Sequence, residues 1–194
     1  YYSKASTVND YGLYMGFREE ADKWSKETIH QGCEIEDIAA GIAPNGDLHV
    51  AYVARKGCEG VDGEFVLMHA RKLAATEANP NPEWEKGYII KAPKVGGFGR
   101  HLSMVMNKNG LPQIAYYEYE NYGDVNADLK NLTTVELTPQ NTYLTKDVSR
   151  WEDIGQHSKM FTDADGEIYI ISYTPENGGS IHLFVEGVNG RLTK

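Results

Sequence analysis

Three segments of the chain share one pattern: an alternating apolar run, a tight turn and a second alternating run. They are residues 37–53 (DIAAGIAPNGDLHVAYV), 101–117 (HLSMVMNKNGLPQIAYY) and 157–173 (HSKMFTDADGEIYIISY). Each turn contains an Asn-Gly or Asp-Gly pair, which is the strongest short-range signal for a β-hairpin. The residue four places after the turn glycine is aliphatic in every copy. The copies therefore share one register, which constrains the fold more than any other feature of the sequence.

Each hairpin is followed by two further predicted strands. Third strands are expected at residues 64–70, 128–135 and 180–185, and the fourth strands open with an aromatic residue at Trp24, Trp84 and Tyr143. Four strands in a unit of roughly 60 residues, repeated along a chain, are typical of β-propeller blades. We therefore predict an all-β fold of four-stranded antiparallel blades.

The ends of the chain predict an incomplete ring. In this register the chain divides into a partial blade (1–32), two blades (33–92 and 93–150) and a second partial blade (151–194), which together form one propeller fragment. Partial blades leave unpaired strand edges, which natural proteins avoid. We expect the remainder of a longer chain, or another protein chain, to complete the propeller.

Charge and hydropathy exclude two classes of partner. The net charge is −9, with 28 acidic against 19 basic residues, so phosphate backbones and anionic membrane surfaces are disfavoured. No apolar run approaches the ~20 residues that a membrane-spanning helix needs. We expect neither nucleic acid binding nor a membrane span.

The repeat unit resembles those of bacterial secreted β-propellers in the broad sialidase-like and BNR-like group. The best match is residues 102–117 together with 127–130, and the likeness extends along nearly the whole chain. The Asp-box of sialidases (Ser-x-Asp-x-Gly-x-Thr-Trp) is absent, as is a recognisable set of catalytic arginines. The resemblance therefore implies blades and says little about a reaction or ligand.

Three polar residues stand at equivalent positions where the innermost strands begin: Asp37, His101 and His157. In a propeller they should lie side by side at the mouth of the central channel. Two imidazoles and a carboxylate could hold a divalent metal, or act as acid and base. The alternative is that they are polar residues lining a wet funnel. No other cofactor is predicted.

Further ligand-binding candidates lie beside these positions. Arg100 and Gln156 directly precede two of the inner strands, and Trp151 falls in a connection on the same face. An exposed aromatic ring there could stack on a sugar. By contrast, Trp24 and Trp84 are interpreted as packing between blades.

Cys33 and Cys58 lie in two connections on one face of the same blade. A disulfide between them is geometrically plausible and would indicate an extracellular, periplasmic or cell-surface location. Two free thiols are the alternative.

The loop 118–128 is rich in carboxylates. Oxygen-rich loops can bind calcium, but this one lacks the ligand order of an EF-hand, so a solvated acidic loop is the alternative. The candidate ligands are Glu118, Glu120, Asp124 and Asp128.

The sequence favours a non-catalytic module that binds protein or glycan or serves as a scaffold, because no catalytic motif accompanies the blade pattern. The alternative is a propeller glycosidase or polysaccharide lyase with a funnel site at Asp37, His101 and His157. A lyase acting on acidic sugars would need basic residues near the funnel, and Arg100 is the one well placed.

Overall fold

A computed structural model describes residues 2–3, 11–32, 34–55, 65–91, 97–120, 129–149, 154–174, 179–186 and 192–193. These residues form fifteen β-strands in four antiparallel sheets and include no helix. Within the same ranges, nothing resembles a helix long and apolar enough to cross a membrane.

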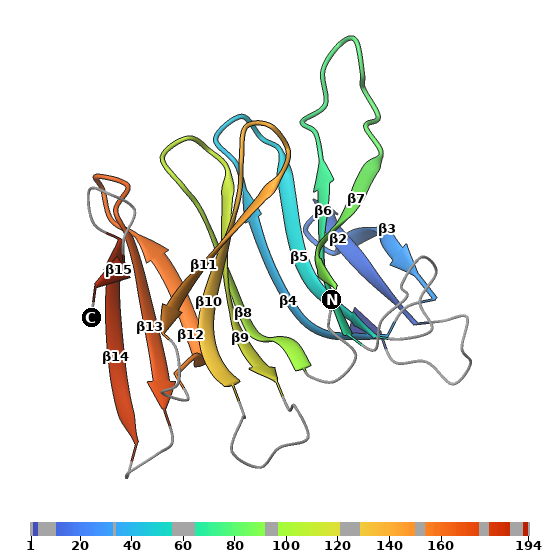
Figure 1. Ribbon diagram of the computed structural model, residues 1–194. Coiled ribbons are helices and arrows are strands. Elements are labelled where there is room, and N and C mark those ends of the chain that lie inside the picture. Colours follow the sequence, from blue (N-terminus) through green and yellow to red (C-terminus); the bar gives the residue numbers. More distant parts are fainter. Residues whose placement is uncertain are drawn as a thin grey trace.

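The four sheets follow one another along the chain (Figure 1). Sheet 1 contains β1 (Tyr2–Ser3), β2 (Gly12–Glu20) and β3 (Lys23–Gln31). Sheet 2 contains β4 (Ile35–Ile42), β5 (Leu48–Arg55), β6 (Phe65–Lys72) and β7 (Trp84–Lys91). Sheet 3 contains β8 (Gly97–Met106), β9 (Pro112–Glu120), β10 (Leu129–Leu137) and β11 (Tyr143–Ser149). Sheet 4 contains β12 (Gln156–Thr162), β13 (Ile168–Thr174), β14 (Ser180–Glu186) and β15 (Leu192–Thr193).

The three predicted hairpins owe their shape to a glycine and a side-chain oxygen. The turn glycines have φ of 87°, 72° and 78°, in the left-handed region that favours glycine; they are Gly46, Gly110 and Gly166. In the second turn, the Asn107 side-chain oxygen accepts hydrogen bonds from the backbone N–H groups of Asn109 and Leu111. The Asp163 carboxylate accepts the equivalent bonds in the third turn, so in both turns the acceptor lies three residues before the glycine.

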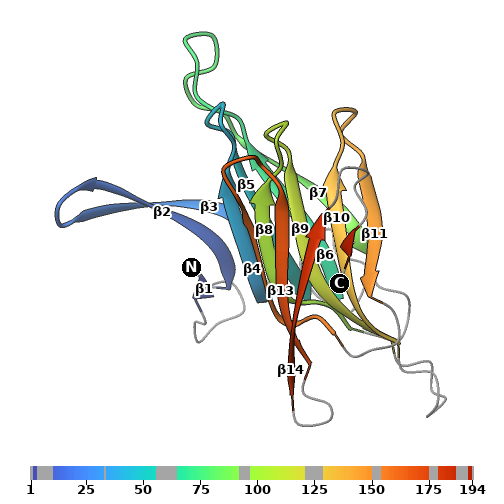
Figure 2. The same cartoon turned by 90° about the vertical axis from the view of Figure 1, so that its left-hand side faces the viewer.

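Successive sheets pack face to face around three apolar layers. The layer between sheets 2 and 3, for example, joins Val53 and Leu67 to Ile114 and Tyr116. The sheets fan out in an arc whose described part does not close into a ring (Figures 1 and 2). The predicted fold class, all-β with antiparallel blades in an incomplete ring, is confirmed. The blade boundaries at 32/33, 92/93 and 150/151 touch undescribed residues, so the division into blades stays a prediction.

The outer face of sheet 4, which points away from sheet 3, is apolar and exposed. It carries Ile171, Tyr173, Ile181 and Leu183. Ile181 has an equivalent residue in each of the two preceding sheets: Leu67 in sheet 2 and Leu132 in sheet 3. Each of the three pairs with the residue that lies seven places after the turn glycine of its own sheet. Both leucines are completely buried by the next sheet, whereas Ile181 is 77% exposed.

Candidate functional site

The innermost strands β4, β8 and β12 each contain a β-bulge near their start. The ladder is irregular at residues 35–38, 100–103 and 156–159. Asp37, His101 and His157 lie inside these three irregularities. Bulges re-aim side chains and are frequent next to functional sites.

The two histidines adopt an unusual backbone conformation and lie together. His101 has a φ of 62° and His157 a φ of 52°, a region that costs a non-glycine residue about 1–3 kcal/mol. Their ring centroids are 4.4 Å apart, and the Tyr117 ring lies 6.2 Å from that of His101. His157 is exposed and His101 is half-buried. The same strained conformation in successive blades presents two imidazoles and a phenol at one end of the sheets.

The Asp37 side chain binds backbone N–H groups. Its carboxylate accepts one hydrogen bond from the Ile38 N–H (2.8 Å) and another from the Leu102 N–H (3.0 Å). The second bond fastens β4 to β8. Across the described ranges, no three His, Cys, Asp or Glu side chains are grouped so that they could hold a metal ion. In this geometry, Asp37 positions the strands that carry the two histidines.

Several predicted site residues fall wholly or partly outside the described residues. These are Cys33, Cys58, Asp124, Asp128 and Trp151, together with the side chains of Arg100 and Glu120. The disulfide, the calcium loop and the sugar-stacking tryptophan therefore stay predictions. Of the remainder, Glu118 accepts a hydrogen bond from the Thr133 hydroxyl (3.2 Å). Gln156 is half-buried, and its backbone carbonyl faces the Ser172 hydroxyl at 3.5 Å.

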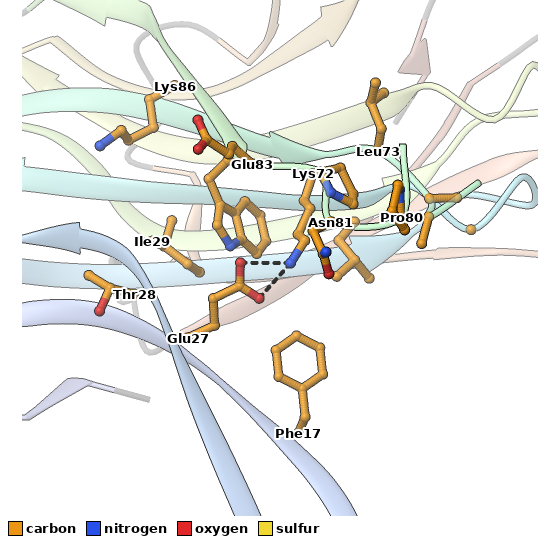
Figure 3. A pocket seen from close by; sticks show the side chains of 16 residues that line it. Phe17, Glu27, Thr28, Ile29, Lys72, Leu73, Pro80, Asn81, Glu83 and Lys86 are labelled. Carbon is orange, nitrogen blue, oxygen red and sulfur yellow. Dashed lines mark hydrogen bonds and ion pairs between the residues drawn. The ribbon is translucent and has the colours of Figure 1, made fainter. Parts of the chain in front are cut away.

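The opposite end of the sheets, where the hairpin turns lie, holds a cleft between sheets 1 and 2 (Figure 3). Its volume is about 720 Å³, within the range of small-molecule sites. The side chains that line it include those of Phe17, Glu27, Lys72, Asn81 and Trp84.

An ion pair and two aromatic residues give this cleft its chemistry. Lys72 Nζ lies 2.6 Å from both carboxylate oxygens of Glu27 and 5.8 Å from the centre of the Phe17 ring. Trp84 Nε1 is buried and has no hydrogen-bond partner within the described structure. The Asn81 side chain lies at the cleft beside the Glu27–Lys72 ion pair (Figure 3). Aromatic faces beside hydrogen-bonding groups can bind a molecule that has both C–H faces and hydroxyl groups.

Sequence reasoning placed the ligand face at the other end and missed this cleft. One signal was present: the connection between the third and fourth strands of sheet 2 runs over residues 73–83 with two Asn-Pro pairs. The corresponding connection in sheet 3 has only residues 138–142. Long connections on a rigid scaffold often carry function.

Two buried histidines link sheets 2 and 3. His49 Nδ1 lies 2.9 Å from His69 Nε2, and His69 Nδ1 lies 3.0 Å from the Tyr143 hydroxyl. Burial lowers the pKa of His49 to about 4 and the pKa of His69 to about 3, with further lowering from the Arg71 charge. Burial raises the pKa of Tyr143 to about 12. All three groups are therefore neutral near pH 7 and form a structural contact.

The sequence matches no family model and no curated protein. The fold is similar to that of a protein of unknown function from Dyadobacter fermentans (TM-score 0.58, 12% identity, 83% of this chain and 54% of that chain). It is also similar to a thermostable family-43 glycoside hydrolase (TM-score 0.58, 13% identity, 100% of this chain and 66% of that chain). A third similar structure is an endo-arabinase from Bacteroides thetaiotaomicron (TM-score 0.52, 12% identity, 90% and 70%).

The chain thus spans between about half and two thirds of the length of the first two of these structures. At 12–13% identity the likeness concerns the fold alone. The comparisons agree with a propeller-type architecture that this chain fills only in part.

Proposed function

We propose that the chain is part of a non-catalytic β-propeller module that binds a glycan in the cleft between sheets 1 and 2. The observation that carries this proposal is the pairing of Phe17 and Trp84 with the Glu27–Lys72 ion pair inside one cleft. A recessed cleft of this kind suits a saccharide better than a protein surface, because protein interfaces are broad and mostly flat.

The polar groups of the cleft suit hydroxyl-rich ligands. The Glu27 carboxylate can accept hydrogen bonds from sugar hydroxyls, while Lys72 and the unpartnered Trp84 N–H can donate them. The partly exposed Phe17 ring offers an apolar face for the C–H groups of a sugar ring. Two of the similar structures, the glycoside hydrolase and the endo-arabinase, are by name proteins that act on glycans.

The propeller is completed by at least one further blade against the outer face of sheet 4. The residues equivalent to Ile181 in sheets 2 and 3 are covered completely by the next sheet, so a blade of the same repeat has the shape and apolarity to cover this face. The remainder of a longer chain or another protein chain supplies it, in keeping with the resemblance to sialidase-like and BNR-like propellers.

We place the module outside the cytosol: extracellular, periplasmic or at the cell surface. The proposal rests on a disulfide between Cys33 and Cys58, which would form and persist only in an oxidising compartment. Thiol titration of the unfolded protein, with and without a reductant, tests this. Two reactive thiols in protein isolated without reductant would count against the placement.

Glycan binding is tested by calorimetric titration with neutral oligosaccharides. We expect Phe17→Ala to weaken binding about 5- to 10-fold, because a stacking contact contributes about 1 kcal/mol. Trp84→Phe should weaken it about 2- to 10-fold through the lost N–H donor. Leu144→Ala, at an exposed leucine of β11 outside both the cleft and the apolar face of sheet 4, is the control. Binding that ignores both cleft variants, or no binding, would refute the proposal.

The second candidate is a propeller glycosidase or lyase that acts at the opposite end of the sheets. It is favoured by one observation, the two left-handed histidines with rings 4.4 Å apart. Imidazoles can serve as a general acid and base. Turnover of a polysaccharide that is lost in both His101→Gln and His157→Gln, and retained in Phe17→Ala, would establish this enzyme in place of the binding module.

A further inference from the structure

The cleft between sheets 1 and 2 is named the Phe17 cleft after one of the aromatic residues that line it. A second cleft lies between sheets 3 and 4, at the same end of the sheets. It has a volume of about 250 Å³. Glu136 and Lys146 come from sheet 3, and Glu186 comes from sheet 4. The ammonium of Lys146 is 3.7 Å from a Glu136 oxygen and 3.3 Å from a Glu186 oxygen.

The two clefts occupy equivalent places in the repeat. Glu27 and Lys146 each lie three residues after the aromatic that marks the fourth strand. Lys72 pairs with Leu48, two places after the turn glycine of sheet 2. Glu186 directly follows Val185, which pairs with Tyr169, three places after the turn glycine of sheet 4. The ion pair of the first cleft thus recurs in the second with its charges exchanged. The repeat thus places an ion pair at equivalent positions in two clefts of different size.

Gln113 gives independent support for a ligand in the second cleft. This side chain lines the cleft and is only 1% exposed, yet its Nε2 has no hydrogen-bond partner among the described residues. A buried amide without a partner is costly, by about 1–3 kcal/mol. A ligand oxygen that accepts this hydrogen bond would remove the cost.

We propose that this second cleft, independently of the Phe17 cleft, binds a neutral polyhydroxyl compound of monosaccharide size. Its volume of about 250 Å³ lies below the ~300–1,000 Å³ of drug-sized ligand pockets, which restricts the ligand to about one sugar ring. The carboxylates of Glu136 and Glu186 accept hydrogen bonds from hydroxyl groups, and Gln113 and Lys146 donate them.

Charge decides against an anionic ligand. Four carboxylates and two ammonium groups line the cleft, so their formal sum is −2; they are Glu136, Asp165, Glu167, Glu186, Lys108 and Lys146. Lys146 already lies between two of the carboxylates, which disfavours a second cation there. A neutral ligand with many hydroxyl groups can bond to these donors and acceptors without adding a charge.

The test is a ¹H–¹⁵N NMR titration of the full chain with glucose, galactose and mannose, each added separately, and with glucuronate as the anionic comparison. We expect saturable shifts at the Gln113 side-chain amide with at least one neutral sugar, and at least tenfold weaker binding of glucuronate. Gln113→Leu should weaken the sugar at least tenfold. The same substitution should leave the melting temperature unchanged or raised, because the amide it removes has no partner.

Gln140→Leu, at an exposed glutamine in the connection between β10 and β11, is the matched control and should change neither property. Phe17→Ala should leave the shifts at Gln113 unchanged, which separates this site from the proposed glycan cleft. The inference is overturned if no neutral sugar shifts the Gln113 amide, if Gln113→Leu binds as tightly as the parent, or if glucuronate binds as tightly as the neutral sugars.

Discussion

At the scale of single residues, the Asp37 carboxylate joins two neighbouring sheets by accepting two backbone N–H groups. Asp37→Ala leaves both donors without this acceptor, so we expect the free energy of unfolding to fall by about 1–3 kcal/mol. Asp37→Asn keeps one acceptor oxygen and should lose less. Urea denaturation measures both changes, and an unchanged midpoint in Asp37→Ala would show that the link contributes nothing.

The buried histidines make stability depend on pH. The folded-state pKa values of His49 and His69, about 4 and 3, lie below the ordinary value of about 6.5. The unfolded chain therefore takes up more protons as the pH falls below 6.5, and stability is lost progressively between pH 6.5 and about 3. His69→Gln should make this loss shallower by up to about 1.4 kcal/mol per pH unit.

Thermal denaturation across this pH range measures the effect of His69→Gln. Gln140→Leu replaces an exposed residue that does not titrate and is the control, because it should keep the slope of the parent protein. Equal slopes in the parent and His69→Gln would contradict the assignment of neutral buried histidines.

At the scale of structural elements, the connection into β12 needs a glycine. Gly155 has a φ of 133°, and an added Cβ would lie 2.8 Å from a Tyr117 ring carbon and 3.2 Å from the Leu132 Cα. We expect Gly155→Ala to lower the free energy of unfolding by about 1–3 kcal/mol through overpacking and backbone strain. Gly87→Ala, where the nearest atom is 3.8 Å away, should cost less. Equal losses would argue against this packing.

The strands could be predicted from the sequence because their signals are local. Asn-Gly and Asp-Gly turns, alternating apolar runs and an aromatic residue at the fourth strand specify each blade within a few dozen residues. The clefts depend instead on how two sheets meet. The Glu27–Lys72 pair joins residues 45 positions apart. The Gln113 amide is unpaired because no described neighbour offers it a hydrogen-bond acceptor. The local pattern of one blade does not reveal either feature.

The position of Asp37 beside the histidines followed from the repeat, yet its bonding could not be foreseen. Equivalent positions in neighbouring blades place Asp37, His101 and His157 at the starts of adjacent strands. Whether a carboxylate there faces solvent or the backbone N–H of the next blade depends on the bulge geometry. A bulge is a tertiary feature that alternation alone does not specify.

At the scale of the whole molecule, the proposed further blade would cover the exposed apolar face of sheet 4. Ile181→Asp places a charge in the middle of this face. In the complete protein or assembly we expect it to lower the melting temperature, because the charge would be buried without a partner. Thr145→Asp, at an exposed residue of β11, provides a comparison outside the apolar face of sheet 4. No difference between the two variants would indicate that the face is open to solvent.

The central claim is that these sheets belong to a propeller that other blades complete. It is tested most directly by the native mass of the protein isolated from the organism that produces it. We predict a mass well above the 21.7 kDa of this chain, as a longer chain or as a stoichiometric complex. A stable, monodisperse particle of 21.7 kDa would contradict the account, because the face around Ile181 would then be exposed to water in the native protein.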